Sequence, residues 1–211
     1  MDVVSDCGMS APGLLEAAPE VFARTELACL VRGTRVETAA GLVAVEDIRD
    51  GMLVETMDNG LQPVRRVLSK VVDGTGALAP VVFDAGVLGN ARSLRVSPHH
   101  RMMVTGWRAE LATGEPEILV EARHLVDRAG VRVEPVASVE YFHLLFDRHE
   151  IVFAEGAPTE SYHPFAADAA SLSPATLAEI VAIFPQAATA LQACRPVRPC
   201  ADAAEAALLL A

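Results

Sequence analysis

Residues 28–41 read Ala-Cys-Leu-Val-Arg-Gly-Thr-Arg-Val-Glu-Thr-Ala-Ala-Gly. Here a cysteine stands just before a β-rich run, Thr34–Thr38, and Ala39–Gly41 supplies the turn signal that closes it. Short β-rich runs then alternate with Gly, Asp, Asn and Pro as far as residue 165. They are Met52–Thr56, Pro63–Val72, Pro80–Phe83, Leu94–Ser97, Arg101–Val104, Val131–Val136, Val139–Phe146 and Ile151–Ala154. Many short strands at this spacing predict an all-β sandwich or closed barrel rather than alternating β–α units.

A second feature lies in the middle of this zone, where the chain reads Ser97-Pro98-His99-His100. A lone cysteine such as Cys29 is usually an inert core residue, so its meaning depends on polar partners elsewhere. Pro98 prevents a continuous strand and forces a turn, which can aim the Ser97 hydroxyl and a histidine ring at one spot. The competing interpretation is a surface turn with two solvated histidines.

A third feature lies within residues 141–156. Two β-rich runs flank the polar step Asp147–Glu150, which contains His149, and His143 lies inside the first run. By itself this pattern indicates a hairpin with a charged tip. A functional interpretation becomes worth considering because this pattern follows the cysteine and the Ser-Pro-His-His segment in the same zone.

Taken in order, the three features resemble the Hint superfamily, the self-processing domains of Hedgehog proteins and inteins. The resemblance spans about residues 28–165 and is closest to bacterial Hint-type domains. The opening segment and Val45–Val54 are similar to the N-terminal intein-type block, with Met52 where the family often has Asp. Val96–Arg101 is similar to the Thr-x-x-His block, and Val139–Ser161 is similar to the C-terminal blocks.

The resemblance implies an all-β, horseshoe-like fold of many short strands with its active site in a cleft. It divides the chain into a helical, extein-like N-terminal arm (1–28), a Hint domain (29–165) and an Ala-rich helical tail (166–211). Within the tail, Ser173–Phe184 begins with a Ser N-cap and a Pro at the first helical position, which predicts a helix. A second helix is expected through Ala201–Leu210, and a protein partner could bind through the tail.

The resemblance also implies a chemistry. In this family the thiol of the first domain residue, here Cys29, attacks the preceding carbonyl, here that of Ala28, in an N→S acyl shift that gives a thioester. The thiol must lose its proton to a base, the departing nitrogen must gain one, and the oxyanion needs fixed donors. Histidine suits the acid and base roles near neutral pH. The substrate would be the chain's own N-terminal segment.

Four further residues match family positions. Ser97 stands where the family usually has Thr, and a serine hydroxyl can donate the same hydrogen bond. His100 matches the block histidine that contacts the scissile nitrogen, and His149 matches the late-block histidine that assists the later steps of inteins. His143 stands near a position where many inteins carry Asp, and an imidazole could serve there.

The end of the zone departs from inteins. Splicing needs a terminal Asn that cyclises, followed by Cys, Ser or Thr. Here Glu160-Ser161 stands where His-Asn would fall, and the chain has only Asn59 and Asn90. We therefore expect no splicing, and a thioester would be resolved by water or another small nucleophile, which releases residues 1–28.

The composition limits the class of protein. Of the 211 residues, 52% are hydrophobic, enough for a sizeable core, and 17 basic against 28 acidic residues give a net charge of −11. This charge argues against a binder of nucleic acid or anionic membranes, since both need a cationic face. The sequence contains no apolar run of about 18 residues, so it predicts no membrane-spanning helix. Gly74-Thr75-Gly76 lacks the strand–helix context of a nucleotide site, and no cofactor is expected.

The expected location follows from the first residues and the cysteines. Met1–Asp6 lacks the basic region of a signal peptide. The four cysteines are too few and too scattered for a disulfide scaffold; they are Cys7, Cys29, Cys194 and Cys200. A cytoplasmic protein is the default expectation, and leaderless export is the alternative.

Three other functions compete with self-cleavage. The first is a catalytically silent Hint fold that serves as an interaction or secretion-associated module. The second is a metal site built from His99, His100, His143 and His149, although no Cys-x-x-Cys or His-Glu-x-x-His spacing supports it. The third is a hydrolase that acts on other molecules through a dyad of Cys29 and His100.

Overall fold

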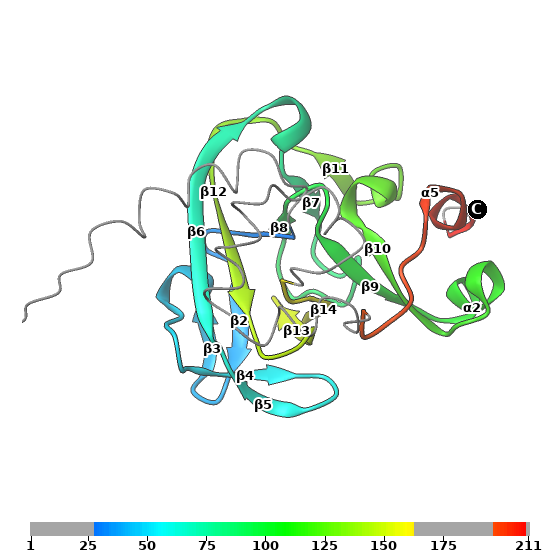
Figure 1. The fold of residues 1–211 in the computed structure, drawn as a ribbon. Helices are drawn as coiled ribbons and strands as arrows, with labels where there is room; N and C mark the ends of the chain where they lie inside the picture. The colour runs from blue at the N-terminus through cyan, green and yellow to red at the C-terminus, as the bar shows by residue number, and fades with distance from the viewer. Residues whose placement is uncertain (1–27, 163–195, 210–211) are drawn as a thin grey trace, which may run out of the picture.

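Two antiparallel sheets form the body of the molecule (Figure 1). The computed structural model describes residues 28–162 and 196–209. The first sheet has the strand order β11-β7-β8-β1-β12-β6. The second has the order β10-β9-β14-β13-β2-β4-β5, with β3 paired to β2. The expected all-β fold is therefore confirmed for the described residues.

The strands are short, as the sequence predicted, apart from one long pair, β6 and β12. Their bounds are β1 (Leu30–Val31), β2 (Arg35–Thr38), β3 (Gly41–Ala44), β4 (Leu53–Thr56), β5 (Gly60–Pro63), β6 (Arg66–Gly74), β7 (Val81–Phe83), β8 (Leu94–Val96), β9 (Arg101–Thr105), β10 (Glu117–Glu121), β11 (Val131–Val133), β12 (Val136–Leu145), β13 (Ile151–Ala154) and β14 (Ala157–Glu160). The helical elements are η1 (Val45–Asp47), η2 (Gly76–Leu78), η3 (Ala122–Leu125), α2 (Trp107–Thr113) and α5 (Ala203–Leu208).

The two-residue strand β1 occupies a central place in the first sheet. It pairs with β12 on one side, where Leu30 faces Phe142, and with β8 on the other, where Leu30 faces Val96. Both pairings are antiparallel, so one step back along β1 sets Cys29 opposite both Ser97 and His143. The register of this short strand therefore brings together residues from three distant parts of the sequence.

The hairpin from β13 to β14 closes the second sheet around residue 155. Glu155 and Gly156 both have positive φ, 51° and 86°, as a two-residue turn of type I′ requires. A glutamate in this conformation is strained. Its buried carboxylate compensates, because it accepts a hydrogen bond from the backbone N–H of Arg35 at 2.8 Å and pairs with the Arg35 guanidinium at 3.1 Å.

One large apolar cluster fills the space between the sheets. Side chains from the two sheets meet in it, among them Val36, Phe83, Met102, Ile118 and Val152, each at most 1% exposed. At about 25 cal/mol per Å² of apolar surface removed from water, this cluster supplies the main driving force for folding. Leu30 of β1, Val96 of β8 and Phe142 of β12 belong to this cluster, so it anchors the three strands that carry the candidate site.

The described part of the tail packs on the edge of the second sheet and on α2. Leu119 of β10 donates its N–H to the Pro199 carbonyl at 2.8 Å and accepts from the Ala201 N–H at 2.9 Å. The guanidinium of Arg198 pairs with Asp58 at 2.8 Å and with Glu117 at 2.6 Å. Figure 1 shows this segment running beside β10 to α5, which lies next to α2.

The helical expectations have mixed outcomes. Helix α5 lies inside the predicted range Ala201–Leu210, whereas the predicted helical arm (1–28) and the helix Ser173–Phe184 fall, apart from residue 28, outside the described residues. Helix α2 was not anticipated. Within the described residues, no helix has both the length and the apolar character that crossing a bilayer requires.

Candidate functional site

Two hydrogen bonds join Cys29 and Ser97, one between their backbones and one to the Ser97 side chain. The Cys29 N–H donates to the Ser97 hydroxyl oxygen at 3.0 Å, and the Ser97 N–H donates to the Cys29 carbonyl at 3.0 Å. Both residues are buried, at 4% and 5% exposure. The nitrogen of the Ala28–Cys29 peptide thus lies against the Ser97 hydroxyl, which accepts this hydrogen bond rather than donating it.

His143 touches both the thiol and the carbonyl that precedes it. Its Nε2 lies 3.2 Å from Cys29 Sγ, and its Nδ1 lies 2.5 Å from the Ala28 carbonyl oxygen. A carbonyl oxygen can only accept, so Nδ1 carries the ring proton. Nε2 then presents its lone pair to the thiol. The same ring is placed to take the proton of the nucleophile and to donate to the electrophile.

Burial controls the protonation of this pair. Burial raises the pKa of the Cys29 thiol well above its usual range, and the hydrogen bond from the Ser97 side chain lowers it only in part. Burial also lowers the pKa of His143 to about 4, against the opposing effect of its bond to the Ala28 carbonyl. Both groups are therefore neutral near pH 7.

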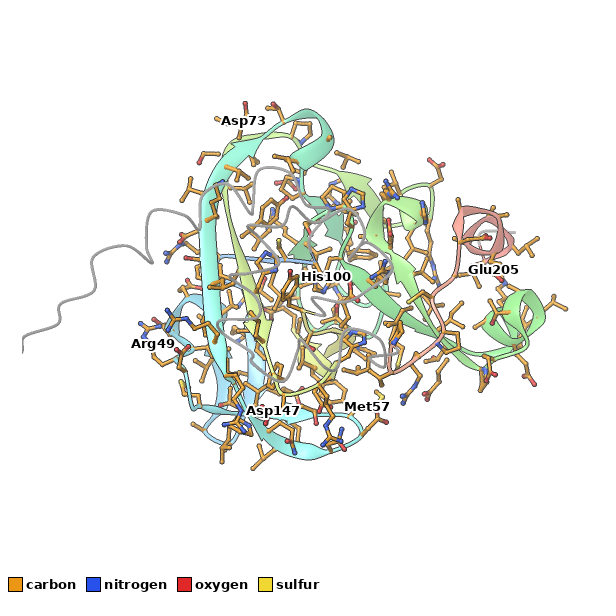
Figure 2. All side chains as sticks on the ribbon, in the orientation of Figure 1. Arg49, Met57, Asp73, His100, Asp147 and Glu205 are labelled. Carbon is orange, nitrogen blue, oxygen red and sulfur yellow. The ribbon has the colours of Figure 1, made fainter. Side chains whose placement is uncertain are left out.

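His100 reaches the site from the turn that Pro98 begins. Its N–H donates to the Ser97 carbonyl at 3.1 Å, which closes a β-turn with proline at the second position. Burial is the main cause that lowers the pKa of His100 to about 3, and charge on His143 lowers it further. The Ala28 backbone raises that pKa, so it faces the ring. Figure 2 shows His100 near the middle of the molecule.

His149 lies beside the tail. Its Nδ1 accepts a hydrogen bond from the Val197 N–H at 3.2 Å, and its Nε2 lies 3.5 Å from a Glu160 carboxylate oxygen. Of the five predicted site residues, Cys29, Ser97, His143 and His100 surround one peptide bond. His149 lies beside Val197 and Glu160.

Sequence reasoning missed two residues that border the site. The Thr159 hydroxyl is a hydrogen-bond partner of His100 Nε2. The Tyr162 ring lies 4.9 Å from the His143 ring between centroids, and it is 8% exposed. Thr159 pairs with Met102 across two strands that are far apart in the sequence. No local motif marks either residue, so only the strand pairing could have revealed them.

The histidines do not assemble a metal site in the described residues. His99 turns toward Glu121, with Nδ1 at 3.3 Å from a carboxylate oxygen, while His100 and His143 face the Ala28 backbone. Within residues 28–162 and 196–209, no three His, Cys, Asp or Glu side chains come together as ligands of an ion.

A family model described as the Hint domain matches residues 28–166. This chain belongs to the Hint domain family. The match begins at Ala28, the residue before the buried thiol, and covers every strand of both sheets. A comparison with curated proteins finds no match to the chain.

Solved intein structures are similar to this Hint domain in fold. A GSH-linked, splice-inactive variant of the AceL NrdHF class 3 split intein is 18% identical, with 63% of this chain and 96% of that chain covered and a TM-score of 0.43. A bacterial intein-like domain from Clostridium thermocellum is 18% identical, with 64% and 99% covered and a TM-score of 0.41. The MchDnaB-1 intein is 16% identical, with 62% and 98% covered and a TM-score of 0.41. At these identities the likeness concerns the fold alone.

The Hint fold supports a general capacity for self-processing. The bond that would be processed, and the route, follow from the chemistry around Ala28 and Cys29.

Proposed function

We propose that this Hint domain cleaves its own chain at the Ala28–Cys29 bond by an N→S acyl shift, without splicing. One observation carries the proposal: the ring of His143 contacts the Cys29 thiol at 3.2 Å and the Ala28 carbonyl oxygen at 2.5 Å. Nucleophile, base and electrophile are thus adjacent before any reaction, which lowers the entropic part of the barrier. The substrate is the chain's own N-terminal segment.

The first step transfers one proton and forms one bond. The lone pair of His143 Nε2 takes the proton of Cys29 Sγ, and sulfur attacks the Ala28 carbonyl carbon. The negative charge that develops on the Ala28 oxygen is stabilised by the hydrogen bond from His143 Nδ1–H, which strengthens because the ring is now an imidazolium. The thiol needs no prior ionisation, which its buried position would oppose.

Collapse of this intermediate breaks the carbon–nitrogen bond. The nitrogen of Cys29 must gain a proton to leave, and it belongs to the same residue as the sulfur. His143 Nε2–H can therefore return to nitrogen the proton that it took from sulfur. The Ser97 hydroxyl, 3.0 Å from that nitrogen, holds it in place. The products are a thioester between Ala28 and Cys29 Sγ and a free amine.

The thioester is then resolved by water or another small nucleophile. Asn cyclisation is chemically excluded where inteins use it, because Glu160 and Ser161 stand there. The Ser161 hydroxyl is buried and accepts a hydrogen bond from the Glu150 N–H at 2.9 Å. Resolution by water releases residues 1–28 as an acid and leaves Cys29 with a free amino group.

Intact mass of the purified full chain tests this proposal. The wild type, Cys29→Ala and the control Cys200→Ala are each incubated with and without excess thiol or hydroxylamine. Cys200 is an exposed free cysteine, so its variant keeps the site intact. We expect a species that begins at Cys29 in the wild type and in the control, increased by the added nucleophile and absent from Cys29→Ala.

Full-length mass for the wild type under every condition would overturn the proposal, and so would cleavage of Cys29→Ala at the same bond. In the first case the silent interaction module would become the better interpretation of the fold.

A further inference from the structure

The chain passes from the second sheet to the first directly after β14. Two hydrogen bonds join Ser161 to Glu150: the Ser161 N–H donates to the Glu150 carbonyl at 2.8 Å, and the Glu150 N–H donates to the Ser161 hydroxyl at 2.9 Å. The next residue, Tyr162, donates its N–H to the Leu144 carbonyl of β12 at 3.1 Å and forms a parallel bridge with Leu145. The backbone of Tyr162 is therefore fixed beside the end of β12.

This position brings the Tyr162 side chain against the imidazole of His143. The two ring centroids lie 4.9 Å apart and the ring planes are tilted by 50°, which is within the range of favourable aromatic pairs. Tyr162 is 8% exposed and His143 is 1% exposed. Burial raises the pKa of Tyr162 above its usual range, and charge on Cys29 raises it further. The phenol is therefore neutral near pH 7, and it acts on His143 through its ring rather than through a charge.

His143 needs such support because both of its contacts depend on one orientation of the ring. Its Nε2 lies 3.2 Å from Cys29 Sγ while its Nδ1 lies 2.5 Å from the Ala28 carbonyl oxygen. A rotation about the Cβ–Cγ bond would move both nitrogens away from their partners at once. The torsion about that bond is intrinsically broad in histidine. A large ring packed against the imidazole narrows it.

We propose that Tyr162 is a positioning residue for the acyl shift: its ring holds the His143 imidazole in the orientation that contacts both reacting atoms, and it keeps water away from that imidazole. This inference rests on the proposed function and adds to its site a residue that acts through His143.

Loss of the tyrosine ring should change the protonation of His143 in a definite direction. Burial lowers the pKa of His143 to about 4, because an imidazolium loses its hydration in a buried site. In Tyr162→Ala the space that the ring filled borders a polar imidazole, so water can enter it. The pKa of His143 should then rise toward the ordinary value of about 6.5. A side chain that only stabilised the fold would leave this pKa unchanged in the folded protein.

Cleavage kinetics of the full chain provide the first readout. Excess thiol captures the thioester, so the release of residues 1–28 in saturating thiol reports the acyl shift. We expect Tyr162→Ala to slow this release by about tenfold or more, because the base is misplaced. Tyr162→Phe keeps the ring and should stay within about threefold of the wild type. Trp107→Ala is the matched control, because it truncates an aromatic ring that is exposed on α2, and it should release at the wild-type rate.

NMR titration of the His143 ring C–H groups provides the second readout, in a Cys29→Ala background that cannot react. With the native tyrosine and with Tyr162→Phe, the midpoint should stay near 4. Tyr162→Ala should raise it by at least about one pH unit. Tyr162→Leu guards against misfolding of Tyr162→Ala, because it keeps an apolar side chain but lacks the flat ring. It should show the same two changes at a smaller size.

An unchanged release rate or an unchanged His143 midpoint in the folded alanine and leucine variants would overturn the inference. An equal loss of rate in Tyr162→Phe and Tyr162→Ala would also overturn it, because the hydroxyl rather than the ring would then matter. If the wild type gives no thiol-dependent release, the proposed function fails and the positioning role fails with it. The NMR midpoint still decides in that case whether Tyr162 keeps water away from His143.

Discussion

At the scale of single residues, the site depends on contacts that one ring makes at both of its nitrogens. His143 reaches the thiol with Nε2 and the preceding carbonyl with Nδ1. Neutral imidazole can take up a proton at one nitrogen while it donates a hydrogen bond from the other, which an Asn or Gln amide cannot do. The arrangement explains why an imidazole can stand near a position where many inteins have a carboxylate, which could accept the thiol proton but not donate to the carbonyl.

Removal of that ring should stop the first step. His143→Gln is expected to slow thiol-dependent release of residues 1–28 by about 10²–10⁴-fold, the usual contribution of a positioned base. His99→Gln is the matched control, because His99 faces Glu121. Time courses of intact mass measure both variants. Cleavage of His143→Gln at the rate of the control would show that another group takes the thiol proton.

The protonation of the two buried rings can be measured directly. Because burial lowers the pKa of His143 to about 4 and that of His100 to about 3, neither ring should titrate between about pH 8 and about pH 5. NMR of the ring C–H groups in the unreactive Cys29→Ala protein provides the measurement. A midpoint near the ordinary value of about 6.5 for either ring would mean that water solvates it.

At the scale of elements, the site depends on strand register rather than on any local motif. The Cys29–Ser97 contact spans 68 positions in sequence and the Cys29–His143 contact spans 114. Both follow from β1 lying between β8 and β12. A shift of one residue in this strand would turn the thiol to the opposite face of the sheet.

The tail helix offers a test at this scale. Asp202 caps α5 by accepting from the Ala204 and Glu205 N–H groups, and the Glu205 side chain accepts from the Asp202 N–H in return. Asp202→Ala should destabilise the helix by about 1 kcal/mol and speed hydrogen exchange of those amides about fivefold. Asp202→Asn keeps an N-cap acceptor and should exchange at nearly the wild-type rate. If the amides exchanged at equal rates in both variants, contacts with α2 rather than the N-cap would stabilise α5.

The sequence predicted some elements well and others poorly, for physical reasons. Hairpin turns were predictable because Asn59-Gly60 and Ala39–Gly41 carry local turn chemistry. Helix α2 was not predictable, because it buries Ala109 and leaves Trp107 and Leu111 exposed at 69% and 77%. Its apolar periodicity therefore gives no inward face to detect.

The residues of the candidate site also fall into those that local motifs predict and those that depend on strand pairing. The family motifs pointed to Cys29, Ser97, His100 and His149 because those residues sit at block positions. They did not assign the central place of His143 or reveal the contact of Thr159 with His100, because both depend on which strands become neighbours. The His149 contact with Val197 joins two segments far apart in the chain, and no local pattern announces it.

At the scale of the whole molecule, folding buries the histidines that surround the Ala28–Cys29 bond. His100 and His143 are 2% and 1% exposed, so folding removes both rings from water in their neutral forms. The burial that keeps His143 neutral and able to accept the thiol proton therefore also makes the fold sensitive to acid.

The sign of this effect follows from proton linkage. The pKa of each ring is lower in the folded state, about 3 and about 4, than the value of about 6.5 in an unfolded chain. The unfolded state thus binds more protons in this interval, so the stabilisation is fully present above about pH 6.5 and is lost as pH falls toward 4. Each ring contributes a slope of about 1.4 kcal/mol per pH unit.

Urea unfolding at about pH 7.5, 6 and 5 should therefore show a steep loss of stability, and comparison with the double variant His100→Gln/His143→Gln isolates the rings. Two carboxyl groups also contribute, in opposite directions, because Glu121 has a lowered pKa and Glu150 a raised one. Both are present in the two proteins, so the comparison removes their effect. The double variant should be less stable at neutral pH and lose less stability on acidification. If the free energy of unfolding fell equally with pH in the two proteins, the rings would be protonated or solvated in the folded state. His143 would then not be the neutral base that the first step requires.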